Sequence, residues 1–246
     1  MRLLLINANT SDFVTSKVRA AAQACASPGT TIEAVTGNFG GRVIGSRTEN
    51  AIGEHSAVDL AAKHAPGMDG VLIAVSYDTG AKALREMLDV PVLGMTEAAL
   101  HAATILGGRV GMIVFGPRVL GLYRDVIDAT GLAGKVGGWR AIDTSKPYAP
   151  GDQSEVEDQI VAACDDLIAK DWVESIVLTG AVMAGVPARI QHRVAVPVLD
   201  GITTGVPMLE AFVKFKPAKP RTGSFAPITG REAVNVDPAL IAKLKG

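Results

Sequence analysis

Short apolar runs alternate along this chain with longer stretches in which apolar residues recur every three or four positions. The runs are typical of buried parallel strands, and they lie at 3–6, 71–75, 92–93, 110–115, 176–178 and 196–199. The longer stretches predict amphipathic helices at 12–25, 50–64, 81–88 and 155–169. Strands that alternate with helices in this way predict an α/β fold built on parallel sheets.

Two segments of the chain resemble each other. The first covers 69–80 and continues at 90–97, and the second covers 174–185 and continues at 196–203. Aligning Gly80 with Gly185 pairs Val75 with Gly180, each at the end of an apolar run. Ligands of parallel sheets bind beyond the carboxyl ends of the strands. We therefore expect two pseudo-symmetric, Rossmann-like lobes with an active-site cleft between them.

The spacing of the repeat also suggests where the lobes divide. Lobe 1 is expected to comprise residues 1–98 plus 206–246, and lobe 2 residues 99–205. Residues 214–231 carry five basic side chains and no acidic one, with phenylalanines among them. We interpret this segment as an extended arm that lies on the protein's own body or on a neighbouring subunit. A short helix should follow Asp237-Pro238.

Composition narrows the range of functions. The chain has 246 residues, 48% of them hydrophobic and 20% charged, and a net charge of −1. These values indicate a globular protein and give no reason to expect nucleic acid or an anionic membrane as partner. The polar residues that follow the first strand exclude a signal peptide, and no apolar run is long enough for a membrane span. We expect a cytoplasmic homo-oligomer that acts on a small molecule.

The two cysteines follow helical stripes. Cys25 continues the apolar positions of the 12–25 helix, and Cys164 those of the 155–169 helix. Both are predicted to be inert thiols on buried helix faces, without a disulfide. The four histidines lie far apart, and neither a dinucleotide nor a phosphate loop follows a strand. The sequence therefore predicts neither a metal nor a cofactor.

Polar side chains gather where the predicted strands end. Asn9, Thr10 and Ser11 follow the first strand, and the segment 76–80 follows the second. Asp78 or Thr79 could simply cap the helix that comes next. If the two loops converge, their amides could hold a carboxylate or an imide carbonyl and stabilise an enolate. We expect the cleft to be lined by four segments: 7–11, 76–80, 96–97 and 179–184.

Five segments in the same order resemble a known family. They are 6–10, 73–80, 91–98, 177–185 and 197–201. Together they resemble the aspartate/glutamate racemase superfamily, and within it the hydantoin racemase-like branch. The resemblance implies cofactor-independent chemistry at a carbon acid, with a cysteine on each lobe acting from opposite faces of the substrate. It places those cysteines at Val75 and Gly180, so both usual thiols are absent.

The resemblance further implies that Asn9, Thr10, Asp78, Thr79 and Thr96 hold the substrate. Three interpretations follow for the activity. The first is a racemase-like isomerase on a small hydantoin, cyclic ureide or amino-acid-type carbon acid. In it Asp78 or Tyr77 serves one face, and Thr179 or a water serves the other.

The second interpretation is a hydrolase or lyase that opens a lactam or cyclic ureide, with Ser76 or Asp78 orienting a water. The third is a protein that binds a small carboxylate and catalyses nothing. The sequence favours the isomerase over the other two.

Overall fold

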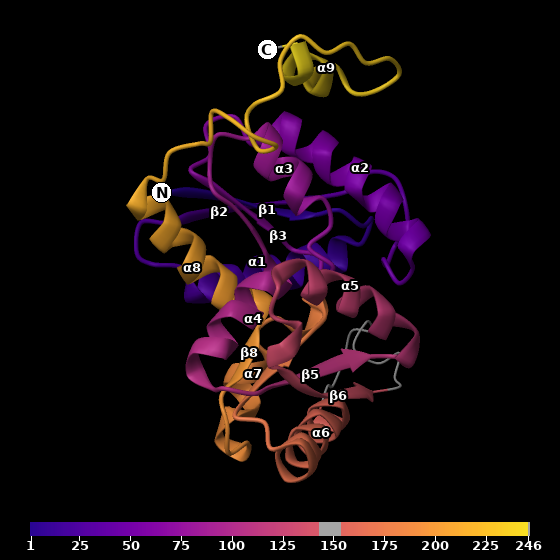
Figure 1. Cartoon of the computed structure of the whole chain (residues 1–246), viewed down its shortest axis with the longest axis vertical. Coiled ribbons are helices and arrows are strands. Elements are labelled where there is room, and N and C mark those ends of the chain that lie inside the picture. The colour runs from indigo at the N-terminus through magenta and orange to yellow at the C-terminus, as the bar shows by residue number, and fades with distance from the viewer. Residues whose placement is uncertain (143–153, 246) are drawn as a thin grey trace.

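The computed structural model describes residues 1–142 and 154–245 and shows two parallel sheets, each covered by helices (Figure 1). One sheet has the order β2-β1-β3-β4, formed by β1 (Arg2–Asn7), β2 (Thr31–Thr36), β3 (Gly70–Ile73) and β4 (Val92–Gly94). The other has the order β6-β5-β7-β8, formed by β5 (Val110–Phe115), β6 (Val136–Ile142), β7 (Ser175–Leu178) and β8 (Val198–Asp200). The predicted α/β class is confirmed, and the two sheets have equivalent orders.

The helices connect these strands in sequence order. Their bounds are α1 (Asp12–Cys25), α2 (Arg47–His64), α3 (Ala81–Met87), α4 (Met95–Leu106), α5 (Leu120–Thr130), α6 (Ser154–Asp171), α7 (Val186–Ile190), α8 (Gly201–Phe215) and α9 (Pro238–Lys245). Below, the β1–β4 half and the β5–β8 half denote each sheet with its covering helices. Helices α4 and α8 pack against each other at the junction of the two halves (Figure 1).

The sequence pattern missed two strands and misplaced an end of two others. β2 and β6 are edge strands with partly exposed residues, so neither forms the continuous apolar run that marked the others. The predicted strand 71–75 ends at Ile73, which leaves Val75 in the loop that follows β3. The predicted strand 196–199 is β8, which begins only at Val198. Each predicted helix is present within three residues of its expected bounds, and α9 follows Asp237 as expected.

One apolar core extends through both halves. It includes Leu5 and Leu72 of the first sheet and Ile113 and Leu178 of the second, all of them fully buried. Helix α8 returns to the first sheet, where Leu209 lies close to Gly70 of β3. This shared core fixes the orientation of the two halves at the strand ends. The division into residues 1–98 plus 206–246 and 99–205 stays a prediction.

The C-terminal segment lies on the β1–β4 half. After α8 the chain has no regular structure until α9, which packs on α2. Lys219 Nζ donates to the carbonyl oxygens of Arg85, Glu86 and Leu88 at the end of α3. Lys63 of α2 pairs with Asp237 at 2.7 Å. These contacts hold parts of the arm against the β1–β4 half, and its predicted role stays a prediction.

Candidate active site

The two copies of the repeat meet where β3 and β7 end. The backbone N–H of Gly180 donates to Ser76 Oγ at 3.0 Å, and both residues are buried. Gly180 has a φ of +92°, a conformation that favours glycine. A cavity of about 40 Å³ lies beside this contact, and we call it the inner cavity. Its lining includes Val75 and Gly180, the two positions that the repeat aligns.

Polar side chains reach the inner cavity mainly from the β1–β4 half. Asn9, Ser76 and Tyr77 line it, whereas the β7 end contributes Gly180, Ala181 and Val182. The Asn9 side chain is held in its loop, because its Oδ1 accepts from the backbone N–H of Ser11 at 2.9 Å and from Asn7 Nδ2. Three of the predicted site residues therefore do converge.

A tyrosine that sequence reasoning missed completes this wall. Tyr123 of α5 lines the inner cavity, and its ring lies 4.9 Å from the ring of Tyr77, centroid to centroid. The chain has three tyrosines, so two of them meet at one cavity from opposite halves. In the sequence, only the rarity of tyrosine could have pointed to Tyr123 as a site residue. Position 123 does not follow a predicted strand, so the strand-end argument could not find it.

Asp78 turns away from the inner cavity and binds the start of α4. Its carboxylate accepts from the backbone N–H groups of Thr96 and Glu97, both at 2.8 Å. Burial raises the pKa of Asp78 to about 7, although the Thr96 N–H and the nearby Arg85 act in the opposite direction. The expectation that Asp78 or Thr79 caps the next helix is wrong, because Gly80 is the N-cap of α3 and Asp78 caps α4 instead.

The remaining predicted residues are engaged in holding loops. Thr96 Oγ1 donates to the carbonyl of Ser76 at 2.6 Å, and Thr79 Oγ1 donates to Asn50 Oδ1 at 2.7 Å. Thr179 Oγ1 donates to the carbonyl of Ile113 at 2.8 Å, and the Thr10 N–H donates to Gly41. None of these four side chains belongs to the inner cavity lining. Their catalytic or substrate-binding roles stay predictions.

The cysteines lie away from the strand ends. Cys164 is buried as expected, but Cys25 is only half-buried, because its position at the last turn of α1 leaves one side open. Burial raises the pKa of the Cys25 thiol to about 11 and that of Cys164 to about 12. Neither thiol lines the inner cavity, so neither is placed to replace a residue at 75 or 180.

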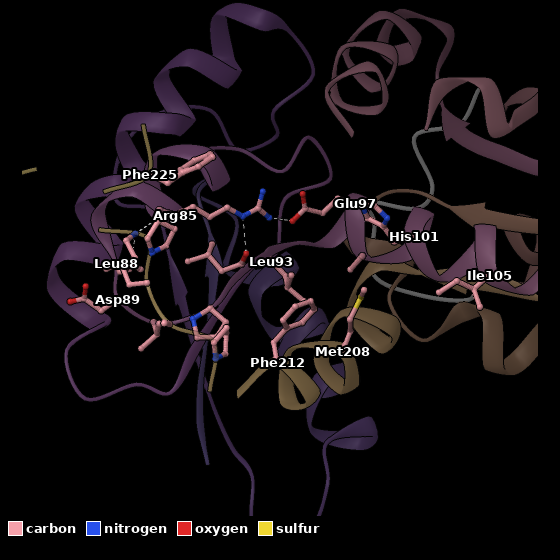
Figure 2. Close-up of a pocket in the computed structure, with 18 of the residues that line it drawn as sticks. Arg85, Leu88, Asp89, Leu93, Glu97, His101, Ile105, Met208, Phe212 and Phe225 are labelled. Carbon is pink, nitrogen blue, oxygen red and sulfur yellow. Dashed lines mark hydrogen bonds and ion pairs between the residues drawn. The ribbon is translucent and has the colours of Figure 1, made fainter. Parts of the chain in front are cut away.

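A larger cavity lies elsewhere. It has a volume of about 630 Å³ and is bounded by α4, α8, the β4 edge and the C-terminal arm. Figure 2 shows the Arg85–Glu97 ion pair at its wall, with Phe212 and Met208 of α8 among its apolar lining. No residue of the 75–76 or 179–182 strand ends lines it. We therefore place the candidate chemistry at the inner cavity, despite its smaller volume.

The described residues contain neither a cluster of metal ligands nor a membrane-spanning helix. Within residues 1–142 and 154–245, no three His, Cys, Asp or Glu side chains group closely enough to hold a metal ion. Over the same ranges, no helix has the length and apolar character required to cross a membrane.

Comparison with known proteins defines the class. The Asp/Glu/hydantoin racemase family model matches residues 3–209, so the chain belongs to that family. A hydantoin racemase of Paenarthrobacter aurescens is 27% identical over 216 residues, which make up 87% of this chain and 91% of the relative. The family and the racemase-type isomerase class expected from the sequence are thereby confirmed.

Two solved structures extend the similarity over nearly the whole chain. An allantoin racemase from Klebsiella pneumoniae superposes with a TM-score of 0.92 at 29% identity and covers 98% of both chains. An allantoin racemase from Pseudomonas fluorescens has a TM-score of 0.83 at 28% identity, covering 96% of this chain and 100% of that one. The fold around the paired strand ends is therefore that of racemases.

Proposed function

We propose that this protein binds a small cyclic ureide of the hydantoin type between its two halves and exchanges the proton on the ring carbon beside a carbonyl. The contact between Ser76 and Gly180 carries this proposal, because it joins the two repeat copies at the strand ends. The relatives that share family and fold act, by their names, on hydantoins and on allantoin. No cofactor and no cysteine takes part in the proposed reaction.

The reaction needs hydrogen bonds to the enolate oxygen and groups that transfer the proton, and polar groups of the inner cavity can supply both. Asn9, Ser76 and the Gly180 N–H are placed to hydrogen-bond a ring carbonyl as it becomes an enolate oxygen. Tyr77 and Tyr123 bring hydroxyl groups from opposite halves, so one can remove the proton and the other return it. Phenols are poor bases near neutral pH, and we therefore expect a slow reaction that accelerates in alkaline solution.

A ring must displace side chains to enter. The inner cavity of about 40 Å³ has room for roughly one water, whose share of liquid volume is about 30 Å³. Three contacts join the two halves in this region: Ser76 with Gly180, Tyr77 with Tyr123, and Arg47 with Asp125 at 2.7 Å. Binding should thus widen the space between the two tyrosine rings.

The experiment follows one enantiomer of a substituted hydantoin in heavy water. We expect loss of the ring C–H signal in NMR together with loss of optical rotation. Tyr77→Phe and Tyr123→Phe should each slow exchange by about 10²-fold, the lower end of what general acid–base groups contribute. His101→Ala, in the cavity of about 630 Å³, is the control and should leave the rate unchanged. A hydantoin that binds without exchanging its proton would refute the isomerase.

A hydrolase or lyase is the second candidate, and the uneven lining of the inner cavity favours it. Asn9, Ser76 and Tyr77 line it from one half, whereas the other half contributes Tyr123, the backbone of Gly180 and the apolar side chains of Ala181 and Val182. Ring opening needs a water and an oxyanion site, and it does not need proton transfer on two faces. A ring-opened product in the same NMR experiment would support it, whereas binding without any product would favour a non-catalytic protein. A homo-oligomer and a cytoplasmic location stay predictions.

A further inference from the structure

A buried amide side chain contacts the loop that carries Asn9. Asn7 is the last residue of β1, and it is fully buried. Its Nδ2 donates to Asn9 Oδ1 at 2.9 Å, to the carbonyl oxygen of Ser11 at 3.2 Å and to Thr15 Oγ1 at 2.9 Å. Its Oδ1 accepts from the backbone N–H of Asn9 at 3.4 Å. Burial of an amide is unfavourable unless the amide is hydrogen-bonded, and these four bonds offset that penalty.

The neighbouring backbone fixes which way both amides face. An N–H group can only donate, so the Asn9 atom that meets the Ser11 N–H at 2.9 Å is the oxygen Oδ1. A carbonyl can only accept, so the Asn7 atom that meets the Ser11 carbonyl is the nitrogen Nδ2. Turning either amide over would bring two donors or two acceptors together. Asn7 and Ser11 therefore hold the Asn9 amide in one orientation.

This orientation leaves the nitrogen of the Asn9 amide for the inner cavity, which Asn9 lines. Among the described residues, Asn9 Nδ2 has no hydrogen-bond partner. Over the same part of the chain, the side-chain polar atoms that are fully buried without a partner belong to Ser56 and Asp59, so Asn9 Nδ2 is accessible. Its two hydrogens can bind an acceptor in the inner cavity.

We infer that Asn7 is a positioning residue: it holds the Asn9 amide so that Nδ2 donates to the ring oxygen on which the enolate charge develops. The inference rests on the proposed function, because it requires the ring carbonyl to lie in the inner cavity. A donor held in advance needs no reorganisation as the charge develops, so it stabilises the transition state more than the neutral ring. Asn7 does not line the inner cavity and acts only through Asn9.

Kinetics of the full chain test whether Asn7 acts through Asn9. In Asn7→Ala, the Asn9 oxygen keeps only its bond to Ser11, so kcat for ring C–H exchange of hydantoin in heavy water should fall about tenfold with KM nearly unchanged. Asn9→Ala should lower kcat by about 10²-fold, as loss of an oxyanion donor does. In the Asn9→Ala background, Asn7→Ala should lower kcat no further. Equal losses in both backgrounds, or no loss in either, would overturn the inference.

Thr15→Val is the matched control for a purely structural effect. It removes one acceptor of Asn7 Nδ2 and the hydrogen bond to Thr36 Oγ1 at 2.7 Å, but it leaves both bonds between Asn7 and Asn9. Urea unfolding should show a similar loss of stability in Thr15→Val and Asn7→Ala, with kcat of Thr15→Val within about twofold of the original. An equal fall of kcat in both variants would contradict positioning. If Asn7→Ala does not fold, Asn7→Ser takes its place in the same comparison.

Binding of an enolate analogue separates this inference from the isomerase. Barbiturate is a planar cyclic ureide that carries an enolate charge at neutral pH, and calorimetry gives its Kd without a reaction. Asn7→Ala should weaken barbiturate binding about tenfold and hydantoin binding less than about twofold, since the held donor favours the charged ring. If hydantoin binds without exchange, the isomerase fails, and this difference alone supports the inference. Equal weakening of both ligands, no weakening, or no binding of barbiturate by the unchanged protein overturns it.

Discussion

The two copies of the repeat cap the helix that follows them with carboxylates from different positions. In the β5–β8 half, Asp200 is the N-cap of α8 and accepts from the backbone N–H groups of Ile202 and Thr203. In the β1–β4 half, the matching N-cap of α4 is Gly94, and the carboxylate comes from Asp78 in the preceding loop. The residue that the repeat aligns with Asp78 is Met183. In each copy, therefore, an aspartate accepts from the first N–H groups of the following helix, but the two aspartates come from positions that the repeat does not align.

In the β1–β4 half, steric contact explains why the carboxylate comes from Asp78 and not from a side chain at position 94. A Cβ atom built on Gly94 would lie 2.2 Å from Asp78 Cγ, so a larger residue and Asp78 cannot share that place. Asp78 itself has a φ of +49°, a strained backbone for a residue other than glycine. The consequence is functional, because Asp78 ties the loop that carries Ser76 and Tyr77 to the start of α4. In the other copy Asp200 also reaches back to the preceding loop, because its Oδ2 accepts from the backbone N–H of Gly185 at 3.0 Å.

Introducing thiols at Val75 and Gly180, which the repeat aligns, is the change with the largest expected effect. Val75→Cys with Gly180→Cys should create racemisation of a hydantoin at least about 10²-fold faster than either single variant, since an acid and a base act as a unit. A Cβ on Gly180 would lie 3.6 Å from the Phe115 ring, which is ordinary contact, but the φ of +92° should cost about 1–3 kcal/mol. The measurement is deuterium exchange at the ring carbon.

Folding of the double variant is checked by circular dichroism and hydantoin binding by calorimetry. If it folds and binds yet exchanges no faster than the single variants, the strand ends no longer direct the C–H bond between positions 75 and 180. The hydrolase or lyase would then become the leading candidate.

The second prediction concerns Gly94. Gly94→Ala should destabilise the protein by about 2 kcal/mol, as overpacking does, because Asp78 must move. In an Asp78→Ala background the same change should cost almost nothing, since the φ of −87° at Gly94 suits alanine. Urea unfolding of the four proteins measures this coupling. Gly134→Ala is the control, because a Cβ there meets nothing within 4 Å. Equal costs in both backgrounds would contradict the steric explanation.

These contacts also show which parts of the fold and of the candidate site could be predicted from the sequence. β1 and β5 are continuous apolar runs and were predicted, as was the approach of Ser76 to the 179–184 segment. β2 and β6 were missed because edge strands need no such run. The cap of α4 by Asp78 joins residues 18 and 19 positions apart, and Tyr123 reaches the inner cavity from another half of the molecule. Such long-range contacts leave no local pattern, so sequence reasoning assigned Asp78 a role in the cleft and left Tyr123 out.

The third prediction concerns how the free energy of unfolding depends on pH, and its expected effect is smaller. Burial raises the pKa of Asp78 to about 7, whereas an unfolded aspartate has a pKa of about 3.9. The folded state then holds a proton that the unfolded state releases, so the stabilising contribution is fully present below about pH 4 and is lost as pH rises through about 7. Because Asp78 is only half-buried, we expect a loss of about 1 kcal/mol. Asp78→Asn should remove this slope in urea unfolding between pH 4.5 and 8. A slope of opposite sign would mean that the two N–H bonds outweigh burial.

The smallest expected effect is that of thiol alkylation, and it compares the two cysteines, Cys25 and Cys164. Raised pKa values of about 11 and about 12 leave well under about 0.1% of either thiol ionised at pH 7.5, and the thiolate is the reactive form. Cys25 is half-buried and Cys164 fully buried, so iodoacetamide should modify Cys25 first, and slowly, as followed by intact mass. Exchange of hydantoin protons and hydantoin binding should both survive modification, because neither thiol lines the inner cavity.

Rapid inactivation that substrate prevents would place a thiol at the site and overturn the assignment of the chemistry to the loops around Ser76 and Gly180. Cys25→Ser, which cannot be alkylated, would then identify the thiol responsible: it should resist inactivation if Cys25 is that group and remain sensitive if Cys164 is.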